Sequence, residues 1–242
     1  MKIKFLFAVF CVCAFSVAAF PQSVVVKPKK ITYKRKNPDA PDYKKTFTIT
    51  YPKISGVSAS LAKKIESNLS YEKLFDFSLK DEIETEAYLY EAVYETFYNK
   101  NGILNIVLSE EVSAAYPSTY EKSVVVNLKT GEKVKPQDVF LKLGELAAQG
   151  GKSQQKEIKK AIADIKKENP DEENPASLFE NTNFTIKDLD DFSVSDKGIT
   201  FRYDYGFPHV ILALQPEGRY FFSWAQLKPF IRRDGLLAKF IR

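Results

Sequence analysis

Apolar and polar residues alternate through the middle of the chain, which is the pattern of half-buried β-strands. Ile103–Leu108 and Ser123–Leu128 are rich in β-branched residues, and the segment from Tyr88 to Tyr98 also alternates. The turns beside these segments, Tyr98–Gly102 and Lys129–Glu132, each contain a glycine where a tight hairpin needs a positive φ. The central stretch therefore predicts antiparallel strands joined by hairpins.

The same patterns predict further elements on both sides of this stretch. A helix at Ser58–Leu69 is indicated by Leu61, Ile65 and Leu69, which are spaced four residues apart and form one apolar stripe. Ser223 and Gln226 have the spacing of a capping box that opens a helix ending near Ile231. Further strands are predicted at Thr46–Pro52, Asn183–Ile186, Asp191–Val194, Ile199–Tyr205 and Arg219–Phe222, and a charged helix at Gln154–Lys167, preceded by a loose segment at Gly144–Ser153.

Met1–Ala19 has the three parts of a secretory signal peptide. Lys2 and Lys4 precede an apolar run, and the small-residue ending Val17-Ala18-Ala19 predicts cleavage after Ala19. The apolar run is shorter than the roughly 20 residues that span a bilayer, and no other stretch is apolar enough to do so. We therefore expect a secreted or periplasmic protein with no transmembrane segment in the mature chain.

The remaining chain divides by composition. Residues 20–45 are rich in lysine and interrupted by prolines, which predicts a basic flexible arm. Residues 46–231 carry the strand and helix patterns, with a helical insertion near 141–182, and residues 232–242 form an exposed basic tail. The predicted fold class is α+β: an antiparallel β-sheet meander with flanking helices, forming a single compact domain after the signal peptide.

The composition argues against thiol chemistry, disulfide bonds and nucleic-acid binding. Both cysteines, Cys11 and Cys13, lie within the predicted signal peptide, so the mature chain has neither disulfides nor a thiol nucleophile. Without Lys2 and Lys4, the 36 basic residues exceed the 31 acidic residues by only about 3 charges. This small excess argues against a nucleic-acid partner.

Binding residues are sought first among the tyrosines. If the strand at Tyr88–Tyr98 is regular, Tyr94 lies on a row of tyrosines whose rings could stack on sugars or cover a protein surface. Tyr116 and Tyr120 lie in the loop that follows the next strand, and a partly buried His209 lies in a loop with an apolar centre. These four residues are the candidate binding residues, although a partly buried sheet face is the favoured explanation of the tyrosine row that contains Tyr94.

Catalytic and metal-binding patterns are scarce. His209 is the only histidine, so neither a zinc site nor a metal cofactor is predicted. Glu110 and Glu111 are adjacent on a strand and should point to opposite faces, so they cannot flank one bond. Glu111 with Glu121 across the loop, or Glu217 beside His209, could still serve a cell-wall hydrolase if the fold brought either pair together. No catalytic residue is assigned, and an enzyme is the less favoured class.

Three segments together carry a family resemblance: NKNGILNIVLS, then VVVNLKTGEKVKPQDVF, then DKGITFRYDYGFPHVILALQPEGRYFFSWAQLKPFI. They resemble the secreted bacterial domain of unknown function at the C-terminus of RsiV-type extracytoplasmic sensors and in PdaC-type cell-wall proteins. The resemblance covers most of residues 90–231 and implies an α+β domain outside the cytoplasm. For the sensors it also implies a non-catalytic role in binding lysozyme. Where many members have Gly-Gly-Ala-His, this chain has Ala114-Ala115-Tyr116-Pro117, so that segment's role does not carry over.

Three hypotheses for function follow. The first is a secreted or periplasmic non-catalytic binding module that recognises a lysozyme-like protein or a cell-wall glycan such as peptidoglycan. The second is a cell-wall-active hydrolase that uses surface carboxylates. The third is a structural envelope protein whose residues 27–36 contact anionic polymer through lysines.

Overall fold

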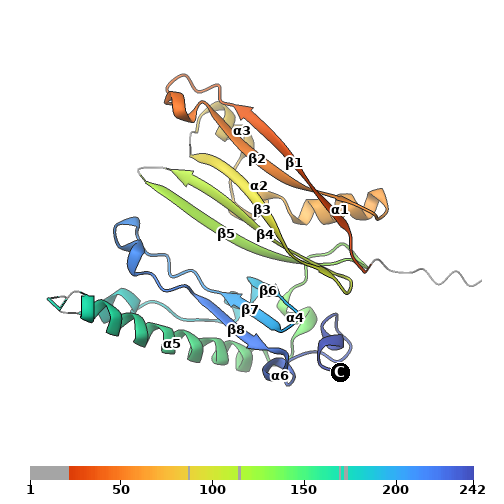
Figure 1. Cartoon of the computed structure of the whole chain (residues 1–242), viewed down its shortest axis with the longest axis vertical. Coiled ribbons are helices and arrows are strands. Elements are labelled where there is room, and N and C mark those ends of the chain that lie inside the picture. Colours follow the sequence, from red (N-terminus) through yellow and green to blue (C-terminus); the bar gives the residue numbers. More distant parts are fainter. Residues whose placement is uncertain (1–21, 87, 114–115, 169, 172–173) are drawn as a thin grey trace, which may run out of the picture.

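The structure, a computed structural model, describes residues 22–86, 88–113, 116–168, 170–171 and 174–242. The chain has an α+β fold in which helices and two β-sheets form successive layers (Figure 1). A five-stranded sheet is covered on one face by three helices. Its other face packs on a three-stranded sheet, which is covered in turn by a long helix. The predicted signal peptide, Met1–Ala19, lies outside the described residues.

The first sheet has its strands in chain order: β1 (Val25–Lys34), β2 (Thr46–Ser55), β3 (Leu89–Lys100), β4 (Ile103–Ser113) and β5 (Pro117–Asn127). Neighbouring strands are antiparallel except β2 and β3, which pair in parallel. The predicted meander is therefore confirmed with one parallel pair added. Among the described strands β1 and β5 are the edges, so each has one side without a neighbour from this part of the chain.

Three helices cover the outer face of this sheet: α1 (Ala59–Asn68), α2 (Tyr71–Phe75) and α3 (Leu79–Glu84). The predicted apolar stripe of α1 supplies Ile65, and Leu69 follows at the end of the helix; both are buried against the sheet. Tyr71 of α2 is 1% exposed, and its hydroxyl donates to the Thr50 carbonyl oxygen at 3.0 Å. This layer is one apolar core shared by the strands and the three helices.

The second sheet consists of β6 (Phe192–Val194), β7 (Gly198–Arg202) and β8 (Arg219–Ser223), all antiparallel. Its core includes five phenylalanines that pack edge to face or tilted. The remaining helices are α4 (Pro136–Val139), α5 (Leu143–Glu168) and α6 (Trp224–Leu227), with 3₁₀ turns at Asp42–Lys44, Pro175–Phe179, Ile186–Asp190, His209–Leu214 and Ala238–Phe240. The predicted capping box of Ser223 and Gln226 opens α6.

The two sheets are joined by a small buried polar cluster. Asn105 of β4 donates from Nδ2 to Ser123 Oγ at 2.8 Å and accepts from the Val194 backbone N–H at 2.8 Å. Ser123 Oγ in turn donates to the Phe192 carbonyl oxygen at 2.7 Å and lies 3.0 Å from Ser193 Oγ. These hydrogen bonds fix β6 across β4 and β5 at one position. Past Ser123, toward Pro117, no strand of the described part of the chain lies beside the outer side of β5.

The prediction of a flexible arm at residues 20–45 is wrong for its described part. Val25–Lys34 forms β1, which pairs with β2 over its whole length. Its β-branched residues favour a strand, while Pro28 and the lysines are tolerated because this is an edge strand. The Arg35 side chain is 1% exposed and donates from Nη2 to Glu82 Oε2 at 2.7 Å. The lysines of residues 27–36 therefore lie on or beside a sheet edge and do not form a free tether.

The loose segment predicted at Gly144–Ser153 is also wrong, because these residues belong to α5. Gly150 faces the ring of Phe184, and a Cβ at that position would lie 2.5 Å from the ring carbons. The glycine therefore serves close packing within a helix. The segment Asn183–Ile186 is not a strand: Thr185 and Asp188 instead cap the 3₁₀ turn that follows.

Two further expectations fail for packing reasons. The tail at 232–242 is not an exposed segment, because Leu237 is fully buried and Phe240 stacks on Trp224 with 4.2 Å between ring centroids. The tyrosine row of β3 does not share one face, because register shifts beside Tyr90 and Phe97 interrupt the alternation. Tyr94 consequently packs beneath the helices, whereas Tyr98 belongs to the core between the sheets.

Replacing Arg35 by methionine should show that β1 is part of the folded domain. The substitution leaves the Glu82 carboxylate buried without its partner, so we expect the free energy of unfolding to fall by about 3 kcal/mol or more. Lys34→Met, at the exposed neighbouring position, should change it by less than about 0.5 kcal/mol. Urea unfolding of both variants makes the comparison, and equal stabilities would contradict the assigned role of Arg35.

Two glycines of α5 should respond in opposite directions to alanine. Gly144→Ala enters open space and should stabilise the protein by about 0.5–1 kcal/mol, the usual helix-propensity gain. Gly150→Ala collides with the Phe184 ring and should destabilise it by about 1–3 kcal/mol. Thermal unfolding measures both changes, and a stabilised Gly150→Ala variant would disprove the close approach of Phe184.

Candidate functional site

A cleft of about 1100 Å³ lies along the part of β5 that continues past the polar cluster. Strand residues 118–123 form one wall, and the other wall comes from the end of β7, the segment around His209 and the start of β8. Lys73 and Leu74 of α2 reach the lining from the outer face of the first sheet, so the cleft extends around the edge of β5.

The backbone of β5 presents unpaired groups to this cleft. The Ser123 N–H points outward to Asp191 Oδ1 at 3.1 Å, and the Val125 carbonyl oxygen points outward to the Val134 N–H at 2.8 Å. Because outward-pointing groups recur every second residue on an edge strand, those of Thr119 and Glu121 also point outward. Neither residue's outward N–H or carbonyl oxygen has a hydrogen-bond partner among the described residues.

Aromatic and apolar side chains lie on both sides of this edge. Tyr116, just before β5, is 60% exposed and stacks on His209 with ring centroids 4.3 Å apart and planes 10° apart. Tyr120, on the strand, is 47% exposed and also lines the cleft. Leu212, in the 3₁₀ turn that begins at His209, adds a partly exposed apolar side chain to the opposite wall.

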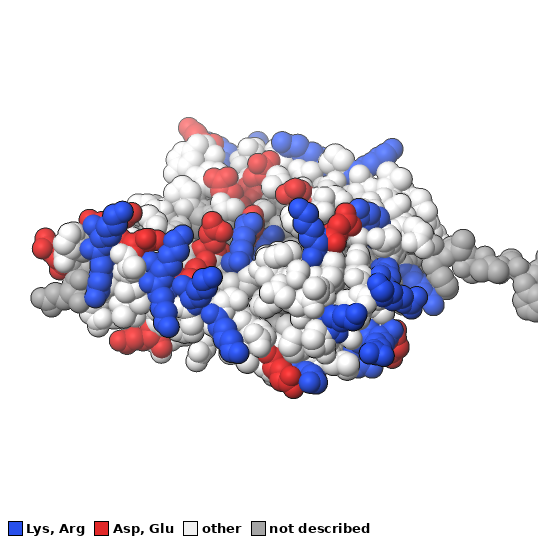
Figure 2. Space-filling view, turned by 60° about the horizontal axis from the view of Figure 1, so that its bottom comes forward, with Lys and Arg blue, Asp and Glu red and all other residues white. Residues whose placement is uncertain are grey.

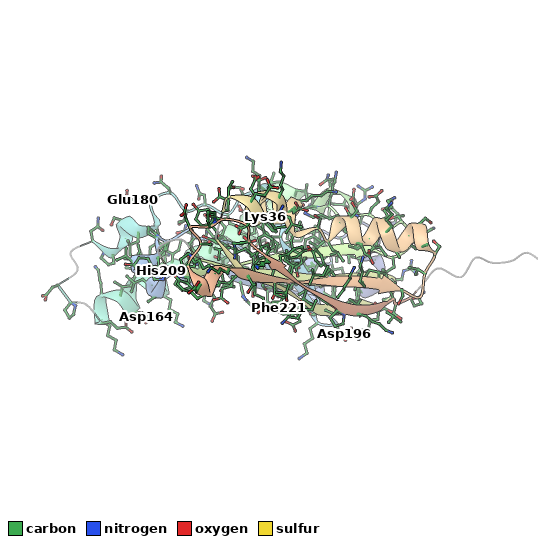
Figure 3. All side chains as sticks on the ribbon, turned by 90° about the horizontal axis from the view of Figure 1, so that it is seen from above. Lys36, Asp164, Glu180, Asp196, His209 and Phe221 are labelled. Atoms are coloured by element: carbon green, nitrogen blue, oxygen red, sulfur yellow. The ribbon has the colours of Figure 1, made fainter. Side chains whose placement is uncertain are left out.

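Three of the four predicted binding residues therefore line one cleft: Tyr116 and His209, which stack on each other, and Tyr120. His209 is exposed, so the expectation of a partly buried histidine is wrong; its ring rests on Tyr116 instead of entering the core. Figure 3 shows His209 well separated along the molecule from Asp196, the hairpin residue between β6 and β7. Tyr94 does not line the cleft, and its burial on the helix-covered face raises the pKa of its hydroxyl.

Charged side chains of both signs line the cleft in equal numbers. The six basic residues are Lys73, Lys122, Lys133, Lys187, Arg202 and Arg219, and the six acidic residues are Glu121, Asp188, Asp190, Asp191, Asp204 and Glu217. Several pair with one another: Arg219 with Glu121 at 3.1 Å, and Lys133 with Asp190 at 2.7 Å. Since the charges balance, the cleft has no strong net field to attract a ligand of one sign.

Asp191 and Arg202 form the inner part of this wall. Burial raises the pKa of Asp191, while the neighbouring Arg202 guanidinium and the Ser123 N–H act in the opposite direction. Arg202 Nη1 has no hydrogen-bond partner among the described residues and lies 3.9 Å from Glu121 Oε2. The Asp191 carboxylate thus accepts from the last paired outward N–H of β5, that of Ser123. The free edge begins at the next outward-facing residue, Glu121.

Of the carboxylates considered for hydrolysis, Glu121 and Glu217 line the cleft and Glu111 does not. Within the described part of the chain, no group of three or more His, Cys, Asp or Glu side chains is arranged to hold a metal ion. The helices described here also include none that is both long and apolar enough to cross a membrane.

Sequence reasoning missed the free strand edge, together with Arg202 and Arg219. A signal was present: residues 118–122 (STYEK) are polar on both faces, unlike the buried strand residues that follow. Such a two-sided polar start is typical of a strand that leaves the core. The loop expected at Ala114–Tyr120 is in part strand, since β5 begins at Pro117; Ala114 and Ala115 lie outside the described residues.

Comparison with known proteins supports the fold. No family model matches the sequence, and no curated protein matches it. The crystal structure of a DUF3298 family member from Bacteroides fragilis NCTC 9343 is similar over 90% of this chain and 98% of that chain, with a TM-score of 0.53 and 12% identity. A DUF3298 family protein from Pseudomonas aeruginosa PAO1 matches over 88% of this chain and 95% of that one, with a TM-score of 0.44 and 11% identity.

At 12% identity the Bacteroides structure shows a likeness of fold alone. The fold is thus one that a member of the DUF3298 family, a family of unknown function, also has. The likeness carries no ligand or activity to the cleft. The resemblance of the sequence to RsiV-type sensors and PdaC-type proteins stays a prediction.

Glu110 and Glu111 do point to opposite faces of β4, as their adjacency predicts. Glu110 is 8% exposed, whereas Glu111 is exposed. Burial, together with the nearby Glu82 carboxylate, raises the pKa of Glu110 from 4.5 to about 7. Glu110 lies on the helix-covered face and does not line the cleft. Titration of its carboxyl group should therefore change the stability of the fold.

The raised pKa of Glu110 predicts a specific pH dependence. Since the folded protein holds this proton more tightly than the unfolded chain, the stabilisation is complete below about pH 4.5 and is lost as the pH rises through about 7. Glu110→Gln should therefore flatten the decline in Tm between about pH 5 and 8. Glu111→Gln is the matched control and should follow the wild-type profile. Parallel curves for the wild type and Glu110→Gln would contradict the prediction.

Proposed function

We propose that this protein is a non-catalytic binding module that acts outside the cytoplasm and binds an extended polypeptide segment of a protein ligand. The segment adds to the free edge of β5, within the cleft. The observation that supports this most directly is the pair of outward-facing residues, Thr119 and Glu121, whose backbone groups have no partner among the described residues.

A peptide strand added to β5 would make both backbone hydrogen bonds and side-chain contacts, which strand addition uses for affinity and specificity. Backbone hydrogen bonds to Thr119 and Glu121 would hold the peptide at the usual strand spacing of about 4.8 Å. Side chains on alternate faces of the peptide would then meet different surroundings: Tyr116, His209 and Leu212 toward the second sheet, and Tyr120 with Leu74 toward α2. The side-chain contacts would supply the specificity.

A polypeptide fits this site better than the glycan that the tyrosines alone suggested. A sugar chain can stack on Tyr116 and Tyr120, but it does not offer alternating N–H and carbonyl groups at strand spacing. The balanced charges of the cleft also suit a peptide of mixed composition better than a strongly charged polymer.

The proposed location rests on the sequence. Met1–Ala19 has the pattern of a signal peptide, and the family resemblance is to domains that work outside the cytoplasm. The same resemblance makes lysozyme the first full-length protein to test as a ligand.

The edge contact is tested by changing one backbone amide. Peptides of ten residues, selected for binding to the wild-type protein from a phage-displayed library, are titrated against Thr119→Pro and Thr119→Val. Proline removes the outward N–H without touching the ladder to β4, so the affinity should fall at least about tenfold. Valine keeps the N–H and should retain affinity within about threefold. Equal affinities for both variants would reject strand addition.

Side-chain recognition is tested separately by retention on immobilised lysozyme and on peptidoglycan sacculi. We expect Tyr116→Ala and Tyr120→Ala to lose lysozyme or peptide binding, which would support the cleft as the site. The control is Tyr43→Ala, which should lose none, because Tyr43 is 70% exposed and lies outside the cleft. A different outcome would identify a glycan as the ligand in place of a peptide. In that case Tyr116→Ala and Tyr120→Ala would reduce retention on sacculi, while Thr119→Pro and Thr119→Val would be retained equally.

A further inference from the structure

The His209 side of the cleft is formed by one loop, residues 203–218, which connects β7 to β8; we call it the wall loop. Its ends are joined by the Tyr203 N–H, which donates to the Gly218 carbonyl oxygen at 2.8 Å. Between these ends lies the 3₁₀ turn that begins at His209. The position of the wall loop therefore decides where His209 meets Tyr116 across the cleft.

Glu157 of α5 binds both ends of the wall loop. Its Oε2 accepts from the Tyr205 hydroxyl at 3.0 Å and from the Tyr220 hydroxyl at 2.9 Å. Its Oε1 accepts from the Gly218 N–H at 3.2 Å. A carboxylate can accept all three hydrogen bonds because its two oxygens offer about four lone-pair sites. One side chain of the helix thus fixes both the entry and the exit of the loop.

These hydrogen bonds lie in a largely buried setting. Tyr205 is 8% exposed, Tyr220 is 5% exposed, and Glu157 is half-buried. Burial raises the pKa of both hydroxyls, so they stay protonated and able to donate. The two hydroxyls lie 2.9 Å apart, so without the carboxylate one could donate to the other, but the second would lose its acceptor. A buried donor without an acceptor is unfavourable.

α5 presents opposite sides to the solvent and to the wall loop. Its lysines are exposed, and Figure 2, in which the lower face of the molecule comes forward, shows Lys and Arg side chains spread over that face. On the inner side, Phe207 and Leu214 of the loop pack on the apolar cluster that contains Ile158 and Ile165 of the helix. Apolar packing is non-directional, so the three hydrogen bonds of Glu157 fix where along α5 the loop lies.

We propose that Glu157 is a positioning residue of the cleft: it holds His209 and Leu212 where an added strand can contact them. The inference rests on the proposed function, because the strand is the ligand proposed there. Glu157 does not line the cleft, so it acts on the ligand only through the wall loop. The long helix is thereby part of the binding site without touching the peptide.

The position of the wall loop can be measured without a ligand. His209 is the only histidine, so its ring protons give one set of NMR signals, which the ring current of the stacked Tyr116 shifts upfield. Glu157→Leu removes all three acceptor contacts and should move these signals at least halfway toward their positions in Tyr116→Ala at the same pH. The control is Ala147→Gly, a buried position about 15 Å earlier along α5, which should destabilise the helix and leave the signals unmoved.

Peptide binding then separates positioning from folding. For the peptides selected on the wild type, Glu157→Leu should weaken binding about tenfold and Ala147→Gly less than about twofold. When His209→Ala and Leu212→Ala are already present, Glu157→Leu should cost less than about threefold, because the side chains that it positions are gone. In Thr119→Pro it should still cost about tenfold, because the contact with the edge of β5 is independent of the wall loop.

Three results would overturn the role of Glu157. The first is a set of His209 signals that stay at their wild-type positions in Glu157→Leu. The second is an equal shift of these signals in Ala147→Gly. The third is a tenfold cost of Glu157→Leu that is undiminished in the variant without the two wall side chains.

If Glu157→Leu does not fold, Tyr220→Phe removes one of the three contacts and is judged by the same signals, which should move in the same direction by a smaller amount. Unmoved signals in Tyr220→Phe would then reject the proposal. A wild-type protein that binds no peptide, or equal affinities for Thr119→Pro and Thr119→Val, would instead reject strand addition. The His209 signals would still decide whether Glu157 holds the loop.

Discussion

The arrangement of this protein depends on the buried contact of Asn105, Ser123 and Ser193 between its two sheets. Each polar group there has a partner, as burial requires, and losing one partner would cost about 1–3 kcal/mol. The contact lies at one position along β4 and β5. Apolar packing closes the sheets on one side of it, and the cleft opens on the other.

The free edge of β5 follows from that geometry. Up to Ser123 the outer side of the strand is occupied by Val134, Glu132 and the Asp191 carboxylate. Beyond Ser123 the second sheet has diverged, and Thr119 and Glu121 have nothing to pair with among the described residues. Exposed strand edges are normally blocked, and this one carries Pro117, Glu121 and Lys122, which discourage indiscriminate pairing. A ligand that pairs here must therefore also satisfy the side chains beside the edge.

The sequence predicted most of the elements because local patterns determine them. The two β-branched strands, the hairpin turns and the Ser223 capping box depend on neighbouring residues and were found. Long-range packing was not predictable in the same way. The glycines of α5 indicated a loop because nothing local announces the Phe184 ring, and β1 was hidden by lysines and proline that an edge strand accepts.

The candidate site also combines features that the sequence shows locally with features that depend on long-range packing. Tyr116, Tyr120 and His209 stood out by residue type, but their meeting depends on how β5 and the His209 turn face each other across two sheets. The backbone groups that carry the proposed function have no sequence signature beyond a polar strand end. Tyr94 packs on the helix-covered face of the first sheet and does not line the cleft.

The central claim, that β5 is open to an added strand, is tested most directly by residue-resolved amide hydrogen exchange measured by NMR. In the free protein, the amides of Thr119 and Glu121 should exchange rapidly, while those of Ser118, Tyr120 and Lys122, which point toward β4, should be protected. A bound peptide should protect Thr119 and Glu121. Uniform protection along β5 in the free protein, or a bound peptide that leaves both amides unprotected, would contradict the account.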